Sequence, residues 1–277
     1  MIEKRSLWRT FKKNRPAVLG LIMGIAVMTI AICAPWLATH DPLEHAIPSR
    51  LDPPSREHWL GTDAYGRDVF TRIIYGSRIS LLVSFASVGF GFLIGALWGM
   101  IGVMTGGWFG SVLMRGVDIL MTFPTLIIGL VVMVILGRGV PNLILAIGIA
   151  MVPRFARIAY GSTTSLINSD FITATKAIGV SKFRLLIKHI FPNISGNLCV
   201  MATMWLAATI RVETALSFLG LGVSPPTPTW GNMIREGINH LSSPWLAIYP
   251  GVAILIATLA FNMLGDGIRD ISDPRLR

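Results

Sequence analysis

Charged residues are scarce in this sequence, and the scarcity comes from long runs that contain none. Only 14% of the 277 residues are charged and 53% are hydrophobic, whereas a soluble domain usually carries about 25% charged residues. Cysteine is almost absent as well. Cys33 and Cys199 are far apart and lack the spacing of metal ligands, which argues against a disulfide framework or a cysteine zinc site. The composition indicates an all-α polytopic membrane protein.

Motifs of catalysis are also lacking. The chain contains no GxxxxGK[ST] phosphate loop, no HExxH, no GxSxG and no cluster of histidine and cysteine. We therefore expect it to bind no ATP or other cofactor, to hold no metal ion and to have no catalytic residue. Its formal charge of +10 could suggest a nucleic-acid partner. The basic residues alternate with apolar runs and form no continuous face, so membrane topology accounts for them better.

Six apolar stretches are long enough to cross a bilayer, which takes about 20 residues of helix. They predict six transmembrane helices at residues 17–38, 79–104, 114–136, 140–160, 196–219 and 246–266. Basic residues precede the first stretch, as they do in a signal peptide. Its apolar run from Ala17 to Ala38 is too long for a typical signal peptide, so we expect a retained helix.

Lysine and arginine are distributed unevenly between the connecting segments. They crowd the N-terminal tail and recur after the fourth span with one acid among them: Arg154, Arg157, Asp170, Lys176, Lys182, Arg184 and Lys188. Because positive residues stay in the cytoplasm, we expect both termini there. The predicted organisation is a basic cytoplasmic tail (1–16), the first helix, an extracytoplasmic loop (39–78), a five-helix core (79–266) with a cytoplasmic loop (161–195) and an extracytoplasmic loop (220–245), and a cytoplasmic tail (267–277).

Glycines indicate where the spans pack closely, and prolines indicate where they bend. Gly91, Gly95 and Gly99 recur every four residues in the second span, so they share a helix face on which two backbones can approach closely. Pro124, Pro153 and Pro250 fall in or beside later spans and predict kinks or broken ends there.

The segment 170–193 is basic and amphipathic, unlike its surroundings. Asp170 is expected to cap a helix through Ile178, with Phe171 and Ala174 on one face. Gly179 then supplies a left-handed turn, and Ser181 is expected to cap a second helix.

Within the second helix, an apolar stripe is predicted at Phe183, Leu186, Ile187 and Ile190, with the basic residues off the stripe. Pro192 is expected to end the unit. Two readings of the segment remain open from the residues alone: a helix that docks on a partner protein, or a loop that packs only on its own bundle.

Two charges lie inside the fifth span, where ionisable residues are expensive and usually functional. Arg211 and Glu213 are two residues apart, so they point to different helix faces and should not pair. We consider either a neighbouring helix or the translocated molecule as the partner of each.

The connecting segments carry weaker signals. Residues 61–68, GTDAYGRD, contain two aspartates but lack the spacing of a calcium loop. The scattered histidines predict no site. In the loop 220–245, a short helix is expected at about Trp230–Ile238.

The stretch TATKAIGVSKFRLLIKHIFP (173–192) resembles the EAA loop of ABC importer permeases, the segment that couples them to their ATPases. Gly179, Ile190 and Pro192 match the pattern, and the small triplet is Thr173, Ala174 and Thr175. The leading glutamate of the family is missing, so its contact cannot be carried over. The resemblance implies an ATPase-coupling site at Asp170, Phe171, Thr173, Ala174, Thr175, Ala177, Gly179 and Pro192.

Three further segments, 58–81, 213–231 and 259–277, resemble the C-type permease of dipeptide, oligopeptide and nickel importers. The resemblance implies the type I ABC importer permease fold, in the inner membrane of a prokaryote. It also implies a second related permease, two ATPase subunits that bind ATP and Mg²⁺, and an extracytoplasmic substrate-binding protein.

The expected function is therefore half of the translocation pathway of an importer, most simply for di- or oligopeptides. The same build could import a nickel chelate, an opine or a glutathione-like solute. An ion-coupled carrier without ATPases is a remote alternative. It would require inverted repeats and acidic residues at the membrane midplane, and the sequence shows no repeat.

Overall fold

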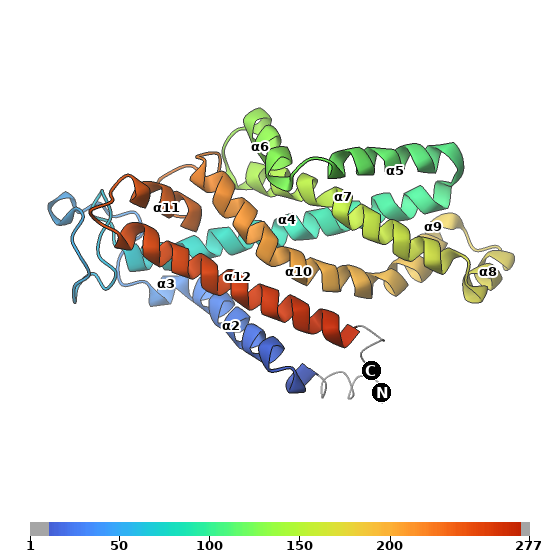
Figure 1. Ribbon diagram of the computed structural model, residues 1–277, viewed down its shortest axis with the longest axis horizontal. Helices are drawn as coiled ribbons and strands as arrows, with labels where there is room; N and C mark the ends of the chain where they lie inside the picture. Colours follow the sequence, from blue (N-terminus) through green and yellow to red (C-terminus); the bar gives the residue numbers. More distant parts are fainter. Residues whose placement is uncertain (1–10, 273–277) are drawn as a thin grey trace.

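The computed structural model describes residues 11–272, which form an elongated bundle of helices (Figure 1). Long helices run side by side along its main axis, and short helices lie at the two ends. The elements are α2 (Arg15–Ile32), α3 (Ala34–Leu37), η1 (Ile47–Ser49), α4 (Val69–Thr105), α5 (Gly107–Met121), α6 (Thr125–Leu136), α7 (Val140–Ile167), α8 (Asp170–Ala177), α9 (Lys182–Leu185), the π-helical η2 (Leu186–Ile190), α10 (Phe191–Phe218), α11 (Trp230–Ile238) and α12 (Trp245–Ser272).

Within the described residues, five helices are long and apolar enough to cross a membrane, and a bent pair raises the number to six. The five are α2, α4, α7, α12 and the continuous helix Lys182–Phe218, which joins α9, η2 and α10. An all-α membrane fold is thereby confirmed. The predicted helix at Trp230–Ile238 is also confirmed, as α11.

Several predicted boundaries are wrong, and local capping explains the largest error. The second span begins at Val69, ten residues before the expected start, because Asp68 caps α4 by accepting a hydrogen bond of 2.8 Å from the backbone N–H of Thr71. The preceding loop is correspondingly shorter than 39–78. The predicted helix 17–38 is broken at Cys33, just before Pro35.

The other ends of the spans extend beyond their apolar runs. Helix α7 continues to Ile167, seven residues beyond the predicted end at residue 160, so Arg154 and Arg157 lie well inside the helix and not in the loop after it. The last helix continues to Ser272, into the predicted tail. In both cases polar residues at a helix end keep their helical hydrogen bonds outside the apolar region.

The predicted third span, 114–136, is two helices rather than one. Helices α5 and α6 meet at an angle of 95°. Pro124 lies at the bend, as the cap of α6, because proline lacks an N–H and disfavours a helical residue before it. With 15 and 12 residues, the two helices are about 22 and 18 Å long, each shorter than the hydrocarbon core. Pro153 and Pro250 lie inside unbroken helices.

Helix α4 packs against α7 through glycines. A Cβ atom added at Gly95 would lie 2.6 Å from the Cβ atom of Phe155 and 2.6 Å from the carbonyl oxygen of Val152. The same clash arises at Gly91 with Met151 and at Gly99 with the backbone of α7. The three glycines therefore permit backbone contact within this chain.

A largely buried cluster of four charges holds together two segments near α11 that are far apart in the sequence. Arg67 contacts Asp63 at 2.6 Å and Glu236 at 3.1 Å, and Arg72 contacts the same two acids at 3.3 and 3.8 Å. Arg72 also donates a hydrogen bond of 3.1 Å to the carbonyl oxygen of Pro42. The cluster fixes the loop before α4 against α4 and α11.

We predict that Gly95→Leu disrupts the bundle, because the new side chain has no space between α4 and α7. The matched control is Gly89→Leu on the same helix, since a Cβ there meets nothing within 4 Å. The measurement is the yield of monodisperse protein and its thermal unfolding midpoint. Equal values for the two variants would show that the glycine contact is dispensable.

We also predict that Arg72→Gln destabilises the protein by about 3–5 kcal/mol, because Asp63 and Glu236 must then share the single positive charge of Arg67 and one negative charge stays uncompensated. The control is Arg157→Gln, whose ion pair with Asp118 at 3.4 Å is about half exposed and should contribute at most about 1 kcal/mol. Thermal unfolding of purified protein distinguishes the two. A smaller loss from Arg72→Gln than from Arg157→Gln contradicts the prediction.

Candidate functional site

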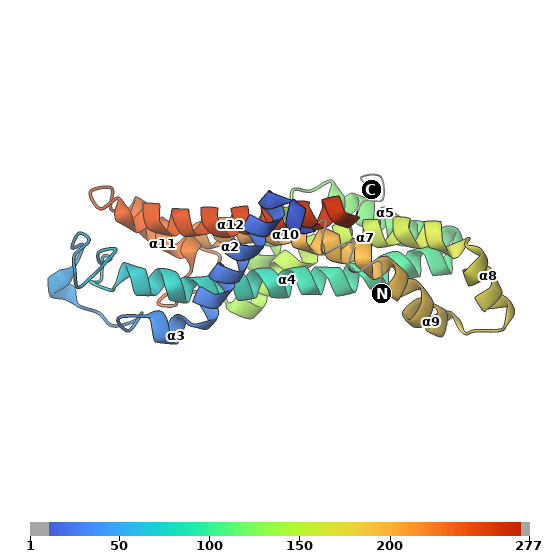
Figure 2. The same ribbon diagram turned by 90° about the horizontal axis from the view of Figure 1, so that it is seen from below.

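The short helices α8 and α9 project from one end of the bundle, opposite the end that carries α11 (Figure 2). Ser169, not Asp170, is the N-cap of α8, so the predicted cap is wrong by one residue. Asp170 instead lies in the first turn, where its negative charge suits the positive end of the helix dipole.

One face of α8 points away from the bundle. Phe171 and Ile178 are 44% and 80% exposed, and Ala174 between them is exposed as well. On the opposite face Ile172 is fully buried and anchors the helix. The apolar outer face is therefore not covered by the described part of this chain.

A glycine turn and a serine cap fix the angle between the two short helices. Gly179 has φ +80°, a conformation that a side chain disfavours by about 1–2 kcal/mol. Ser181 accepts a hydrogen bond of 3.4 Å from the backbone N–H of Arg184 and caps α9, as predicted. Of the remaining triplet residues, Thr173 is exposed and Thr175 half-buried; Ala177 is exposed.

The predicted end of this unit is wrong. Pro192 does not stop the helix but lies in the first turn of α10, directly after the π-helical residues of η2. The wider π turn alters the carbonyl positions that the proline ring would otherwise meet. The predicted stripe is also half right: Leu186 and Ile190 are buried, whereas Phe183 and Ile187 are exposed.

The two charges within α10 have different surroundings. Arg211 is exposed and Glu213 is fully buried, which confirms that they point to different faces. The hydroxyl of Ser217 donates a hydrogen bond of 2.8 Å to Oε1 of Glu213. The other carboxylate oxygen of Glu213, Oε2, has no hydrogen-bond partner within residues 11–272. Ser80 of α4 faces the same carboxylate.

Arg154 is a residue of the bundle interior that the sequence did not single out. It extends from α7, donates a hydrogen bond to the hydroxyl of Thr125 at the start of α6, and lies 4.7 Å from the ring centroid of Trp205 on α10. A cation at this position connects three helices beside the bend. The signal in the sequence that could have pointed to Arg154 is its position directly after Pro153, inside a predicted span.

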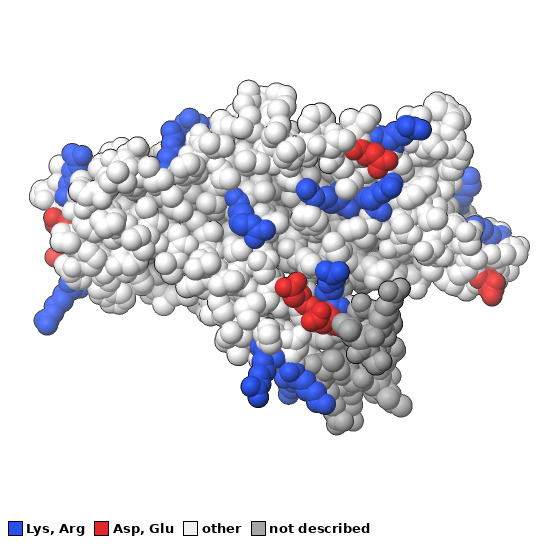
Figure 3. All heavy atoms as spheres, viewed as in Figure 1, with Lys and Arg blue, Asp and Glu red and all other residues white. Residues whose placement is uncertain are grey.

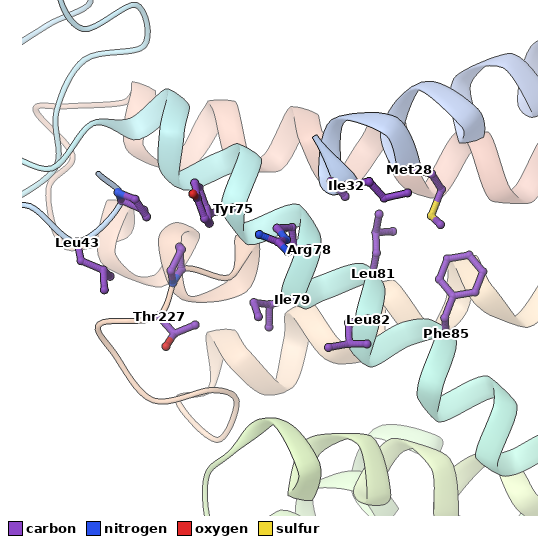
Figure 4. A pocket seen from close by; sticks show the side chains of 13 residues that line it. Met28, Ile32, Leu43, Tyr75, Arg78, Ile79, Leu81, Leu82, Phe85 and Thr227 are labelled. Atoms are coloured by element: carbon purple, nitrogen blue, oxygen red, sulfur yellow. The ribbon is translucent and has the colours of Figure 1, made fainter. Parts of the chain in front are cut away.

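A cavity of about 700 Å³ opens between α2 and α4 (Figure 4). Its walls are mostly apolar, with Met28, Leu81, Leu82 and Phe85 among them. Arg78 is the charged residue of its described lining and lies near the Tyr75 ring. This lining suits an apolar group next to an anionic one.

Sequence comparison identifies the chain at the level of a family. Residues 91–277, more than half of the chain, match the family described as "Binding-protein-dependent transport system inner membrane component". Residues 5–54 match the family described as "N-terminal TM domain of oligopeptide transport permease C".

Curated relatives match over almost the whole chain. The dipeptide transport system permease protein DppC of Alkalihalophilus pseudofirmus is 39% identical over 99% of this chain and 90% of its own length. The glutathione transport system permease protein GsiD of Escherichia coli is 37% identical over 98% of this chain and 90% of its own length.

A solved structure shows the same fold. A chain of the MetNI methionine ABC transporter, in an inward-facing form, is 19% identical and superposes with a TM-score of 0.59 over 73% of this chain and 97% of that chain. The fold is thus that of an ABC transporter permease. The protein is a multi-pass inner membrane component of a binding-protein-dependent ABC transport system, and it belongs to the oligopeptide permease C branch of that family.

Proposed function

We propose that this chain forms half of the translocation pathway of an ATP-driven importer of short peptides or glutathione. The other half is a second, related permease, and two ATPase chains and an extracytoplasmic binding protein complete the complex. The bent pair α5 and α6 counts as one span, which gives six spans in a type I arrangement with both termini in the cytoplasm.

The positions of charge support this orientation. Asn14 before α2 donates a hydrogen bond of 3.3 Å to Asp270 near the end of α12, so the first and last spans have their terminal ends on the same side. On the face shown in Figure 3, most Lys and Arg side chains lie toward that side and the α8–α9 end. Positive residues favour the cytoplasm, which supports a cytoplasmic position for α8.

The exposed face of α8 is the observation that carries the proposal. Phe171, Ala174 and Ile178 offer a narrow apolar surface that a groove on an ATPase can cover. Burial of the Phe171 ring would contribute about 1.5–3 kcal/mol, whereas the small Ala174 lets the helix lie deep in the groove. Because the family glutamate is missing, docking here depends on this apolar contact more than on charge.

A structural connection links α8 to the membrane interior. Gly179 holds α8 at a fixed angle to α9, and α9 continues into α10 without a break. Movement of α8 with a closing ATPase would therefore reach Arg211 and Glu213. This is the conformational step that switches the pathway between outward- and inward-facing states.

Arg211 is the stronger candidate for the pathway surface. An exposed arginine within a span must face water, a protein partner or the transported molecule, because lipid would leave the charge unsolvated. Dipeptides and glutathione, the solutes named for the two relatives, both carry carboxylates that an arginine can bind. Glu213 is buried, and we assign it to holding α10 beside α4.

The test of coupling is Ala174→Trp in the complete complex of both permeases, both ATPases and the binding protein. The indole ring should prevent close docking, so that the ATPases no longer co-purify and substrate-loaded binding protein no longer stimulates ATP hydrolysis. Gly179→Val should act in the same direction because it strains the turn. The two permeases should still assemble in both variants.

The matched control is Lys188→Trp, which adds the same ring at an exposed position outside the α8 face. It should keep most of the ATPase association. If Ala174→Trp retains both co-purification and stimulated hydrolysis at the level of the unmodified complex, α8 is not the coupling element.

A second test concerns the pathway. Arg211→Gln should lower uptake of the peptide or glutathione bound by the binding protein, by about tenfold or more if a charge-assisted hydrogen bond to the solute is lost. ATPase association should not change. Unchanged uptake in proteoliposomes, with the complex intact, would remove Arg211 from the pathway.

A further inference from the structure

Two histidines and an aspartate meet where the first outer loop enters α4. One ligand atom from each of His40, His58 and Asp68 lies within 4.8 Å of the others. The linear sequence does not group them, because the two histidines are separated by η1 and the turns around it. We propose that these three residues bind a divalent transition-metal ion of the zinc type.

The distances are close to those of a metal site. Nδ1 of His58 is 3.0 Å from Oδ1 of Asp68, and Nδ1 of His40 is 3.8 Å from Oδ2. Two ligands of one tetrahedral zinc ion, with bonds of about 2.0–2.2 Å, lie about 3.2–3.6 Å apart. Small side-chain rotations suffice to place a metal ion between the three groups.

The backbone orients one of the ligands, as an outer shell does in metal sites. The carboxylate of Asp68, which is 1% exposed, accepts a hydrogen bond of 2.8 Å from the backbone N–H of Thr71. The carboxylate is therefore fixed before any ion binds. The hydroxyl of Thr39 lies 2.9 Å from Nδ1 of His40 and has to turn away for that nitrogen to bind the ion.

The site is accessible to a metal ion. The side chain of His40 is 29% exposed, so an ion and a water molecule as fourth ligand can reach the three groups. The two imidazole centroids are 4.7 Å apart, which lets both rings contact one ion.

The donor set selects the kind of ion. Two imidazole nitrogens and one carboxylate oxygen suit Zn²⁺ or a neighbouring first-row ion, whereas Mg²⁺ and Ca²⁺ require more oxygen ligands. The carboxylate of Asp63, in the same loop, is already paired with Arg67 and Arg72. It is not available to build an oxygen-rich site, in line with the absence of calcium-loop spacing in this segment.

A bound ion would connect three parts of the outer surface: the segment after α3, the turn at His58 and the start of α4. Binding to the folded state alone stabilises a protein by RT ln(1 + L/Kd), where L is the free ion concentration. We therefore assign the site to metal-dependent stiffening of the outer loop.

The test uses the assembled transporter, purified through an affinity tag without histidine and stripped with a chelator. Zn²⁺ is then titrated, with bound metal and the thermal unfolding midpoint as readouts. We expect one more Zn²⁺ per permease chain in the unmodified complex than in His40→Gln. In His40→Gln, the affinity of the site for Zn²⁺ should fall by more than the roughly 10–100-fold that follows loss of an outer-shell partner.

His45→Gln is the matched control, since His45 lies on the same loop but stacks on Tyr65 outside the cluster. It should keep the Zn²⁺ site. Because His58→Gln also removes the contact with Asp68, its effect is read from the visible absorption of bound Co²⁺ in folded complex, which should lose its tetrahedral bands. Equal Zn²⁺ stoichiometry and affinity in the unmodified, His40→Gln and His45→Gln complexes would overturn the proposal, as would equal stabilisation by Mg²⁺.

Discussion

The backbone contact between α4 and α7 is the constraint on which the rest of the bundle depends. Lipid tails are as apolar as leucine, so helices in a bilayer associate through close packing rather than through hydrophobic burial alone. Gly91, Gly95 and Gly99 provide that packing over two turns. Around this pair the other spans find fixed positions: α10 lies against α4, and α2 lies along α12, where Gly20 meets the backbone near Leu264.

The two ends of the bundle differ in the kind of surface that they present. Near α11, Arg72 and its partners form a closed, buried network that fixes several loops. At the opposite end, the outer face of α8 is open and apolar. Such a division suits a protein whose one end holds a stable shape while the other exchanges contacts with a moving partner.

The sequence predicted what local patterns determine and missed what depends on contacts between distant residues. Hydropathy located the spans, and the left-handed Gly179 and the cap at Ser181 followed from the chemistry of single residues. The start of α4 at Val69 could not be read from apolar content, because capping by Asp68 makes polar residues helical. The continuation through Pro192 was missed because a π turn precedes it. Arg154 and the pair His40 and His58 acquire neighbours only in the folded chain.

The continuous helix Lys182–Phe218 has a mechanical consequence. Its 37 residues make a rod up to about 56 Å long, longer than the hydrocarbon core is thick. Such a rod acts as a lever: a tilt of about 5° around its midpoint moves the two ends by about 2.5 Å in opposite directions. A displacement at Lys182 is thereby converted into an opposite displacement at Arg211, which lies beyond the midpoint of the rod.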